Sequence, residues 1–297
     1  MIPQFPDSQT RDERVRLIRE AIDPKVHSAE HLEDELTALF QSCGKPLVLT
    51  RVTYDPRVSE KAGRAVLPIV VYDAGEADFR AEPDNADRKH SQMITAPMIS
   101  HGLLVDLLEM NHIRKTLGIA MNGELATSFR NCHLTTIQEF LALAIWRNPS
   151  GIVPNYRTMA GKKDVDWQFA AGAIPVLLEV KFRRTDWRRG HPETVTFNLP
   201  RLFAEIGEKF PDANAGFLRV AHVVLVQPID GDVCQAAQDF AASAMVDAVI
   251  LQPLNEVGGA QIVVLGKSAD LVRAQVQESR TFHRPGVVPI IYRRPSR

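Results

Sequence analysis

Residues 163–183 constrain the fold more than any other stretch, because two runs of alternating apolar and polar residues flank a short Ala/Gly turn. The runs cover residues 163–170 and 174–183. Successive side chains of a strand point to opposite faces of a sheet, so each run predicts a strand with one apolar and one polar face. Two such runs around a tight turn indicate an antiparallel hairpin.

The polar faces of these two strands carry acids and a lysine. In the second strand Glu179 and Lys181 share a face, with roughly 6–7 Å between their Cα atoms. A hairpin loop of two or four residues puts Asp166 of the first strand on that same face, and a four-residue loop from Ala171 to Ile174 places it directly opposite Glu179. An odd loop would separate them unless a bulge compensated.

Facing carboxylates repel each other and favour a divalent cation between them. Oxygen ligands of this kind suit Mg²⁺ or Mn²⁺. A metal ion lowers the pKa of its bound water, and a nearby lysine can orient that water and neutralise developing phosphate charge. Asp166, Glu179 and Lys181 therefore predict hydrolysis of a phosphodiester.

The acid-x-lysine spacing alone is common. It recurs at Asp23-Pro-Lys25 and Asp87-Arg-Lys89, but neither of these lies in an alternating strand that follows a second acidic strand. The alternative interpretation of residues 163–183 is a solvent-facing sheet with cross-strand ion pairs, each worth about 0.2–1 kcal/mol.

Asp166 followed by Glu179-Val-Lys181 resembles the motif of the PD-(D/E)xK nuclease superfamily, which has the restriction-endonuclease-like fold. Val165 stands where the family name has proline. The family core runs helix, three strands, helix, strand. We expect the same order here: helix 134–146, strands 155–160, 163–170 and 174–183, helix 199–210 and strand 218–227. The resemblance covers roughly residues 125–230.

The resemblance implies an Mg²⁺- or Mn²⁺-dependent endonuclease, with DNA rather than RNA as the substrate because most of the family cuts DNA. Asp166 and Glu179 would hold the metal and Lys181 would position the water. Glu139 on the first core helix would be a further acid, with Glu124 as second choice; Asp164 is the alternative to Asp166. A homodimer is compatible with cutting both strands. The alternative is a catalytically inactive module that keeps the fold and binds nucleic acid or a protein.

Basic residues gather around the motif. Residues 157–190 hold eight Lys or Arg against four acids, whereas the whole chain has 35 Lys or Arg against 36 acids and a net charge of -1. Nucleic-acid affinity must therefore come from a local patch. The solvated-loop interpretation stays open for each member, and the predicted contacts to nucleic acid are Lys162, Lys163, Arg183, Arg184, Arg188 and Arg189.

We expect an α/β protein of two parts: an N-terminal α+β accessory region over residues 1–95 and a nuclease-like domain over residues 96–297. Three widely spaced cysteines without a C-x-x-C pair, no signal peptide and no membrane-spanning run predict a cytoplasmic protein. A regulator that senses a ligand through residues 1–95 is a third interpretation, which a polar pocket there would favour.

Other elements follow from periodicity and caps. The sequence predicts a helix after a capping box at Thr10, helix 28–40, strands 46–52 and 66–72, and a linker or surface loop over 74–94. Further expected elements are three helices between Met98 and Trp146 with breaks near His112 and His133, helix 233–245, strands 247–253 and 260–265, and helix 267–279.

Overall fold

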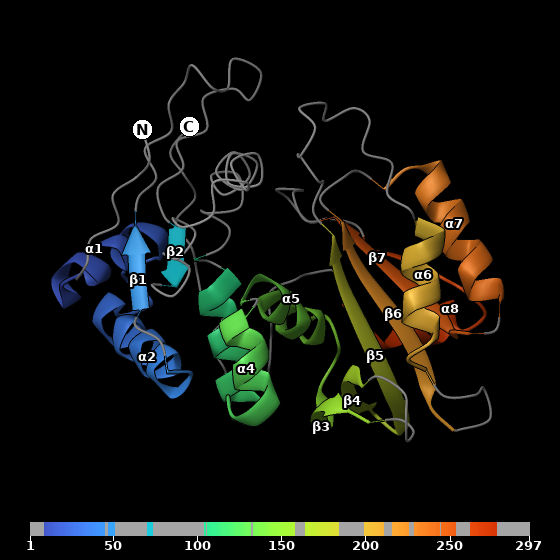
Figure 1. The fold of residues 1–297 in the computed structure, drawn as a ribbon, viewed down its shortest axis with the longest axis horizontal. Helices are drawn as coiled ribbons and strands as arrows, with labels where there is room; N and C mark the ends of the chain where they lie inside the picture. Colours follow the sequence, from blue (N-terminus) through green and yellow to red (C-terminus); the bar gives the residue numbers. More distant parts are fainter. Residues whose placement is uncertain are drawn as a thin grey trace, which may run out of the picture.

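The chain folds into an α/β architecture with a six-stranded mixed sheet and a separate two-stranded sheet (Figure 1). It is represented by a computed structural model. The structure describes residues 9–44, 47–50, 70–73, 104, 106–131, 133–157, 164–183, 199–210, 216–225, 229–243, 245–253 and 262–277.

The N-terminal region begins with two helices, α1 (Arg11–Ala21) and α2 (Ala29–Ser42). The predicted capping box is confirmed, since the Thr10 side chain accepts a hydrogen bond from the Glu13 N–H and the Glu13 carboxylate accepts one from the Thr10 N–H. Strands β1 (Leu47–Thr50) and β2 (Val70–Asp73) pair antiparallel. The expected loop at 74–94 and the expected domain boundary near residue 95 lie outside the described residues, so both stay predictions.

Helices link this region to the large sheet. A helix covers residues 106–116 and is followed by α4 (Gly123–Asn131) and α5 (His133–Ala144). The expected break near His112 is wrong, because the helix continues to residue 116 and ends before Gly118, whose φ of 69° suits a C-terminal cap. The break near His133 is confirmed.

The large sheet has the order β3-β4-β5-β6-β7-β8. Its pairs are antiparallel except β5–β6 and β6–β7, which are parallel. Helix α6 joins the first parallel pair and α7 the second. The strands are β3 (Pro149–Tyr156), β4 (Val165–Ala171), β5 (Ile174–Arg183), β6 (Leu218–Leu225), β7 (Ala248–Pro253) and β8 (Val263–Leu265), and the helices are α6 (Leu199–Gly207), α7 (Gly231–Ala242) and α8 (Ala269–Gln275).

Helices cover both faces of this sheet. Helices α6 and α7 lie side by side on one face (Figure 1), where Phe203 and Phe240 stack and pack with Leu177 and Val223 of the strands. On the other face α5 packs against Trp167, and Phe140 makes an edge-on contact with its indole ring. The element order α5-β3-β4-β5-α6-β6 is the expected helix, three strands, helix, strand.

The first strand of this core does not lie where the sequence predicts it. Strand β3 covers residues 149–156 instead of 155–160. It contains Pro149, Gly151 and Pro154, which disfavour strands in the interior of a sheet. Among the described strands, β3 lies at the edge of the sheet and pairs with β4 alone, and its register shifts between Ser150 and Val153, so both prolines are tolerated.

Among the described residues, none of the helices combines the length and the apolar character that a bilayer crossing needs. Among the described residues, Cys43 and Cys234 form no disulfide.

Candidate active site

The β4–β5 hairpin brings Asp166 and Glu179 together. The ladder runs from Ala171↔Ile174 to Trp167↔Leu178, so the turn consists of Gly172 and Ala173 alone. Gly172 has a φ of 62°, a conformation that tight hairpin turns require and glycine supplies without strain. The observed pairs have the register in which, one step further, Asp166 would stand opposite Glu179, as the sequence predicts.

The pairing between β4 and β5 ends at Trp167↔Leu178, next to Asp166. Its Oδ2 accepts a hydrogen bond of 2.7 Å from the Val180 backbone N–H, so a carboxylate takes the place of a ladder partner. Val165 packs in the core cluster under α6 and α7, whereas Trp167 packs in the cluster under α5. At Asp166, side chain and backbone of the two strands are thus joined by the hydrogen bond to Val180 instead of by the ladder.

Glu179 is the most buried group at this point. Its side chain is fully buried, and Oε1 lies 2.5 Å from Lys181 Nζ and 2.6 Å from Lys209 Nζ. Neither ion pair has the geometry of a hydrogen bond, and Oε2 also lacks a hydrogen-bond partner among the described residues. A buried carboxylate oxygen without a donor is costly, so its position calls for a cation or another partner.

Lys209 is the residue of this site that the sequence analysis missed. It follows α6 in the chain, and its Nζ also lies 4.0 Å from Asp166 Oδ1. One sequence signal could have found it. Leu202, Ile206 and Lys209 have the i, i+4, i+7 spacing of one helix face, so a lysine stands in line with the buried residues of α6.

Glu139 joins the site from the other face of the sheet. Its backbone oxygen accepts a hydrogen bond of 3.0 Å from Trp167 Nε1, which fixes α5 against β4. Burial, together with the negative charge of Glu179, raises the pKa of Glu139 to about 7 against the opposing effect of Lys181 and Lys209. The prediction that α5 contributes an acid to the site is in line with this electrostatic coupling.

The pKa of Asp166 is raised as well. Burial raises its pKa well above the ordinary value, and the charges of Glu179 and Glu139 add to the increase. Three carboxyl groups thus face two ammonium groups. We call Glu139, Asp166, Glu179, Lys181 and Lys209 the Asp166 cluster.

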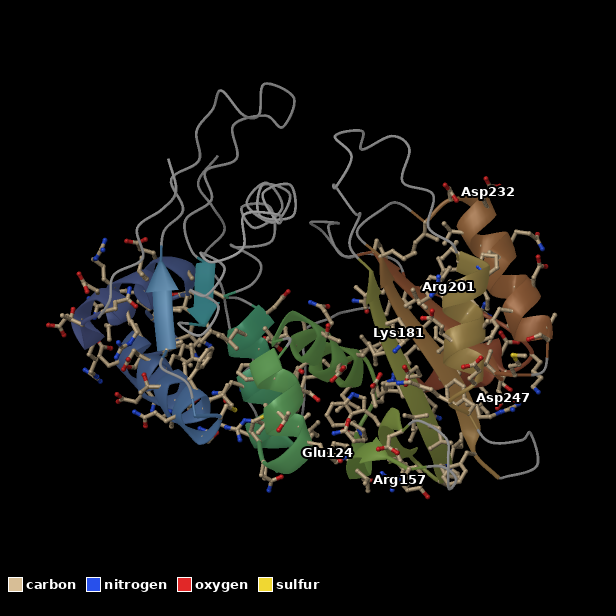
Figure 2. All side chains as sticks on the ribbon, in the orientation of Figure 1. Glu124, Arg157, Lys181, Arg201, Asp232 and Asp247 are labelled. Atoms are coloured by element: carbon tan, nitrogen blue, oxygen red, sulfur yellow. The ribbon has the colours of Figure 1, made fainter. Side chains whose placement is uncertain are left out.

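The alternative acids lie elsewhere. Asp164 pairs with Arg157, whose Nε lies 3.2 Å from Asp164 Oδ1. Glu124 is exposed at the start of α4. Figure 2 shows Glu124 and Arg157 apart from Lys181. Neither Asp164 nor Glu124 is among the charges that shift the pKa of Asp166. Of Asp164 and Asp166, Asp166 is therefore the acid that we assign to the candidate site.

The predicted nucleic-acid contacts fall almost entirely outside the described part of the chain. Arg183 is the last residue of β5 and pairs with Leu225 of β6 in the backbone register. The side chain of Arg183 lies outside the described residues, and so do the residues Lys162, Lys163, Arg184, Arg188 and Arg189.

The donor set of the Asp166 cluster fits a hard divalent cation. Its acidic members offer carboxylate oxygens, which Mg²⁺ and Mn²⁺ prefer, and Glu179 Oε2 is a buried oxygen without a donor. Within the described ranges, no three His, Cys, Asp or Glu side chains converge closely enough to enclose a metal ion. Asp166 and Glu179 are therefore the residues that would hold the ion, with Glu139 near enough to act on their charge.

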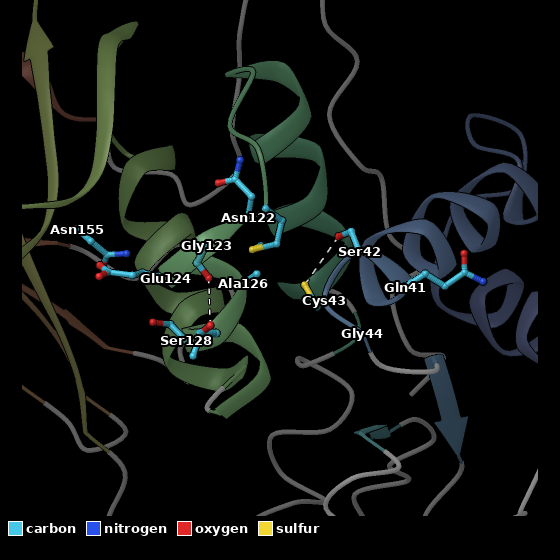
Figure 3. Close-up of a pocket in the computed structure, with 12 residues that line it drawn as sticks. Gln41, Ser42, Cys43, Gly44, Asn122, Gly123, Glu124, Ala126, Ser128 and Asn155 are labelled. Atoms are coloured by element: carbon cyan, nitrogen blue, oxygen red, sulfur yellow. Dashed lines mark hydrogen bonds between the residues drawn. The ribbon is translucent and has the colours of Figure 1, made fainter.

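A separate pocket of about 1010 Å³ lies between the end of α2 and the start of α4 (Figure 3). Among the described residues, its lining includes the amides of Gln41, Asn122 and Asn155 and the carboxylate of Glu124. The pocket lies partly on residues 41–44, so it favours the interpretation that the N-terminal region senses a ligand.

No protein-family model matches this chain, and no curated protein or solved structure is significantly similar to it.

Proposed function

We propose that this protein is a metal-dependent nuclease of the PD-(D/E)xK type. The observation that carries the proposal is the convergence of Asp166 and Glu179 at the end of the β4–β5 ladder, with Lys181 beside them and a buried Glu179 oxygen left without a donor. In a purely structural ion-pair network, buried carboxylate oxygens usually have donors.

The arrangement of elements supports the same proposal. The order α5-β3-β4-β5-α6-β6, with β5 parallel to β6, corresponds to the helix, three strands, helix, strand of the restriction-endonuclease-like core. In that core the motif acids lie on the second and third strands, as Asp166 and Glu179 do on β4 and β5.

The reaction is hydrolysis of a phosphodiester. A water oxygen forms a bond to phosphorus, the bond between phosphorus and the leaving sugar oxygen breaks, the water gives up a proton, and the leaving oxygen takes one up. Mg²⁺ or Mn²⁺ held by Asp166 and Glu179 would supply a Lewis acid that lowers the pKa of water and neutralises phosphate charge. Lys181 orients the attacking water and stabilises the negative charge that develops on the phosphate oxygens.

The resemblance favours DNA as the substrate. The basic segment 157–190 would contact the phosphates, and a homodimer would place two sites on a duplex. The three widely spaced cysteines of the sequence fit a reducing compartment, so we expect a cytoplasmic enzyme.

One observation favours a second candidate, the catalytically inactive module that binds nucleic acid or a protein. Lys209 lies 2.6 Å from Glu179 and neutralises part of its charge. A carboxylate with a fixed internal counterion needs no metal. Metal-dependent cleavage separates the two candidates.

The test is a cleavage assay on supercoiled, linear and single-stranded DNA and on RNA, with Mg²⁺, Mn²⁺ or EDTA. Lys181→Ala is the test variant. Lys267→Met is the matched control, because Lys267 also pairs with a carboxylate on this sheet but lies outside the Asp166 cluster. We expect metal-dependent cutting that Lys181→Ala abolishes and Lys267→Met retains. Cutting that survives in Lys181→Ala would reject this site, and the absence of both cutting and metal binding would favour the inactive module.

A further inference from the structure

Lys209 stands between the two carboxylates of the proposed centre. Its Nζ is 2.6 Å from Glu179 Oε1 and 4.0 Å from Asp166 Oδ1, and its side chain is 14% exposed. The turn that carries it is anchored, since the Lys209 N–H donates to the Ile206 carbonyl and the next residue, Phe210, is buried. The flexible side chain, rather than the backbone, is therefore the part that can change position.

A place between two carboxylates is also the place that a divalent cation requires. An ammonium group and a metal ion compete for the same oxygens and repel each other at contact distance. A cation shared by Asp166 and Glu179 can bind only when the ammonium group of Lys209 withdraws from them. Lys181 lies on β5 itself, two residues after Glu179, whereas Lys209 follows α6.

We infer that Lys209 is a built-in counterion, which balances the charge of the centre in the metal-free protein and which a divalent cation displaces. The inference rests on the proposed function, because it takes Asp166 and Glu179 as metal ligands. With Lys209 in place, two ammonium groups face three carboxyl groups; without it only Lys181 remains. Lys209 thus stabilises the metal-free state of the wild-type chain and weakens its metal binding.

The test measures Mn²⁺ affinity by titration calorimetry on the full chain, and compares wild type with Lys209→Met. Removal of the competing ammonium group should tighten Mn²⁺ binding by at least about ten-fold. The matched control is Lys267→Met, which removes a lysine 2.8 Å from Asp247 and should leave Mn²⁺ affinity unchanged. Equal or weaker binding by Lys209→Met would overturn the inference.

Thermal unfolding gives a second readout on the same proteins. Without metal, Lys209→Met should melt at a lower temperature than wild type, because two buried carboxylates lose their shared counterion. Mn²⁺ should then raise the melting temperature of Lys209→Met more than that of wild type. An equal increase in both proteins would count against displacement.

Wild-type protein supplies a test that needs no folded variant. Lysine acylation followed by mass spectrometry compares the labelling rate of Lys209 with and without Mg²⁺. Displacement should expose the amine and speed its labelling several-fold, while Lys267 keeps its rate. A Lys209 rate that is unchanged or lower with Mg²⁺ bound would overturn the inference.

Failure of this inference is distinguishable from failure of the proposed function. If wild type binds Mn²⁺ and Glu179→Gln abolishes that binding while Lys209→Met changes nothing, the metal centre stands and the counterion role is rejected. If wild type binds no Mn²⁺, the proposed function itself is rejected.

Discussion

Two clusters of charged side chains lie on the same sheet, and their charges are satisfied to very different degrees. Figure 2 labels one member of each, Asp247 and Lys181. The first, which we call the Asp247 cluster, consists of Asp247, Arg219 and Lys267. The Arg219 guanidinium donates to both oxygens of Asp247 at 3.1 and 3.2 Å, the Arg219 backbone N–H donates at 2.8 Å, and Lys267 lies 2.8 Å away. Both Asp247 oxygens therefore have partners.

The Asp166 cluster shows the opposite pattern. It holds three carboxyl groups against two ammonium groups, and Glu179 Oε2 has no donor among the described residues. Hydrogen bonds from Arg219 and Lys267 lower the pKa of Asp247 against the effect of its burial. Burial and neighbouring acids raise the pKa of Asp166.

The difference in pairing suggests a structural role for the Asp247 cluster and a functional role for the Asp166 cluster. A buried charge that is fully paired holds elements together, as the Asp247 cluster joins the starts of β6 and β7 to the residues before α8. A buried cluster that crowds three carboxyl groups around two ammonium groups and leaves one oxygen without a donor is unfavourable for folding alone, and such clusters gather at functional sites. The four predictions below test this contrast in order of expected effect.

The largest effect should come from Glu179→Gln. The substitution keeps the shape of the side chain but removes the charge on the proposed metal ligand, so cleavage should fall by at least about 100-fold. Initial rates on plasmid DNA in Mg²⁺ measure the change. Asp247→Asn is the control and should cut at the rate of wild type. If Glu179→Gln cuts as fast as this control, the two clusters do not differ in function.

Asp247→Ala should produce the largest loss of stability. It leaves the buried Arg219 guanidinium without its partner, which costs about 3–5 kcal/mol in comparable pairs. Urea unfolding followed by circular dichroism measures the change in free energy of unfolding. A loss below about 1 kcal/mol would mean that the Asp247 cluster does not hold the sheet together.

A smaller effect is expected from pH, because it alters the charge of Asp247 without removing its side chain. Since the folded pKa of Asp247 lies below its ordinary value, its ion pairs contribute stability in full above about pH 4 and lose it as pH falls through the folded pKa. The stability difference between wild type and Asp247→Asn should therefore shrink at acid pH. A difference that stays constant from pH 7 down to pH 3 would contradict this role.

Asp166→Asn should have the smallest effect on stability. The amide oxygen can still accept from the Val180 N–H, and one of three crowded carboxyl groups is gone. Unfolding free energy should equal that of wild type or exceed it by up to about 1 kcal/mol, the usual pattern when a functional site is neutralised. A loss above about 2 kcal/mol in urea unfolding would show that Asp166 serves structure.

The hairpin was predictable because its information is local. Alternation assigned the faces of β4 and β5, and an even loop was enough to bring Asp166 opposite Glu179. The strand β3 was misplaced because Pro149 and Pro154 have low strand propensity, and only its edge position in the sheet makes them acceptable.

The missed residues depend on contacts between distant segments. Lys209 reaches Glu179 only because α6 returns the chain across the sheet from β5 to β6. Arg219 and Asp247 meet because β6 and β7 are parallel neighbours, and nothing in either local sequence pairs them. Spacing predicts which face a side chain occupies, but not which distant charge it meets there.

Mn²⁺ binding tests the central claim most directly, because it asks whether the Asp166 cluster is a metal centre. Electron paramagnetic resonance on the full chain would count bound Mn²⁺ in wild type, Asp166→Asn, Glu179→Gln and Asp247→Asn. The account predicts bound Mn²⁺ in wild type and Asp247→Asn, and loss of it in the other two variants. Binding that survives in both Asp166→Asn and Glu179→Gln, or that is absent from wild type at millimolar Mn²⁺, would contradict it.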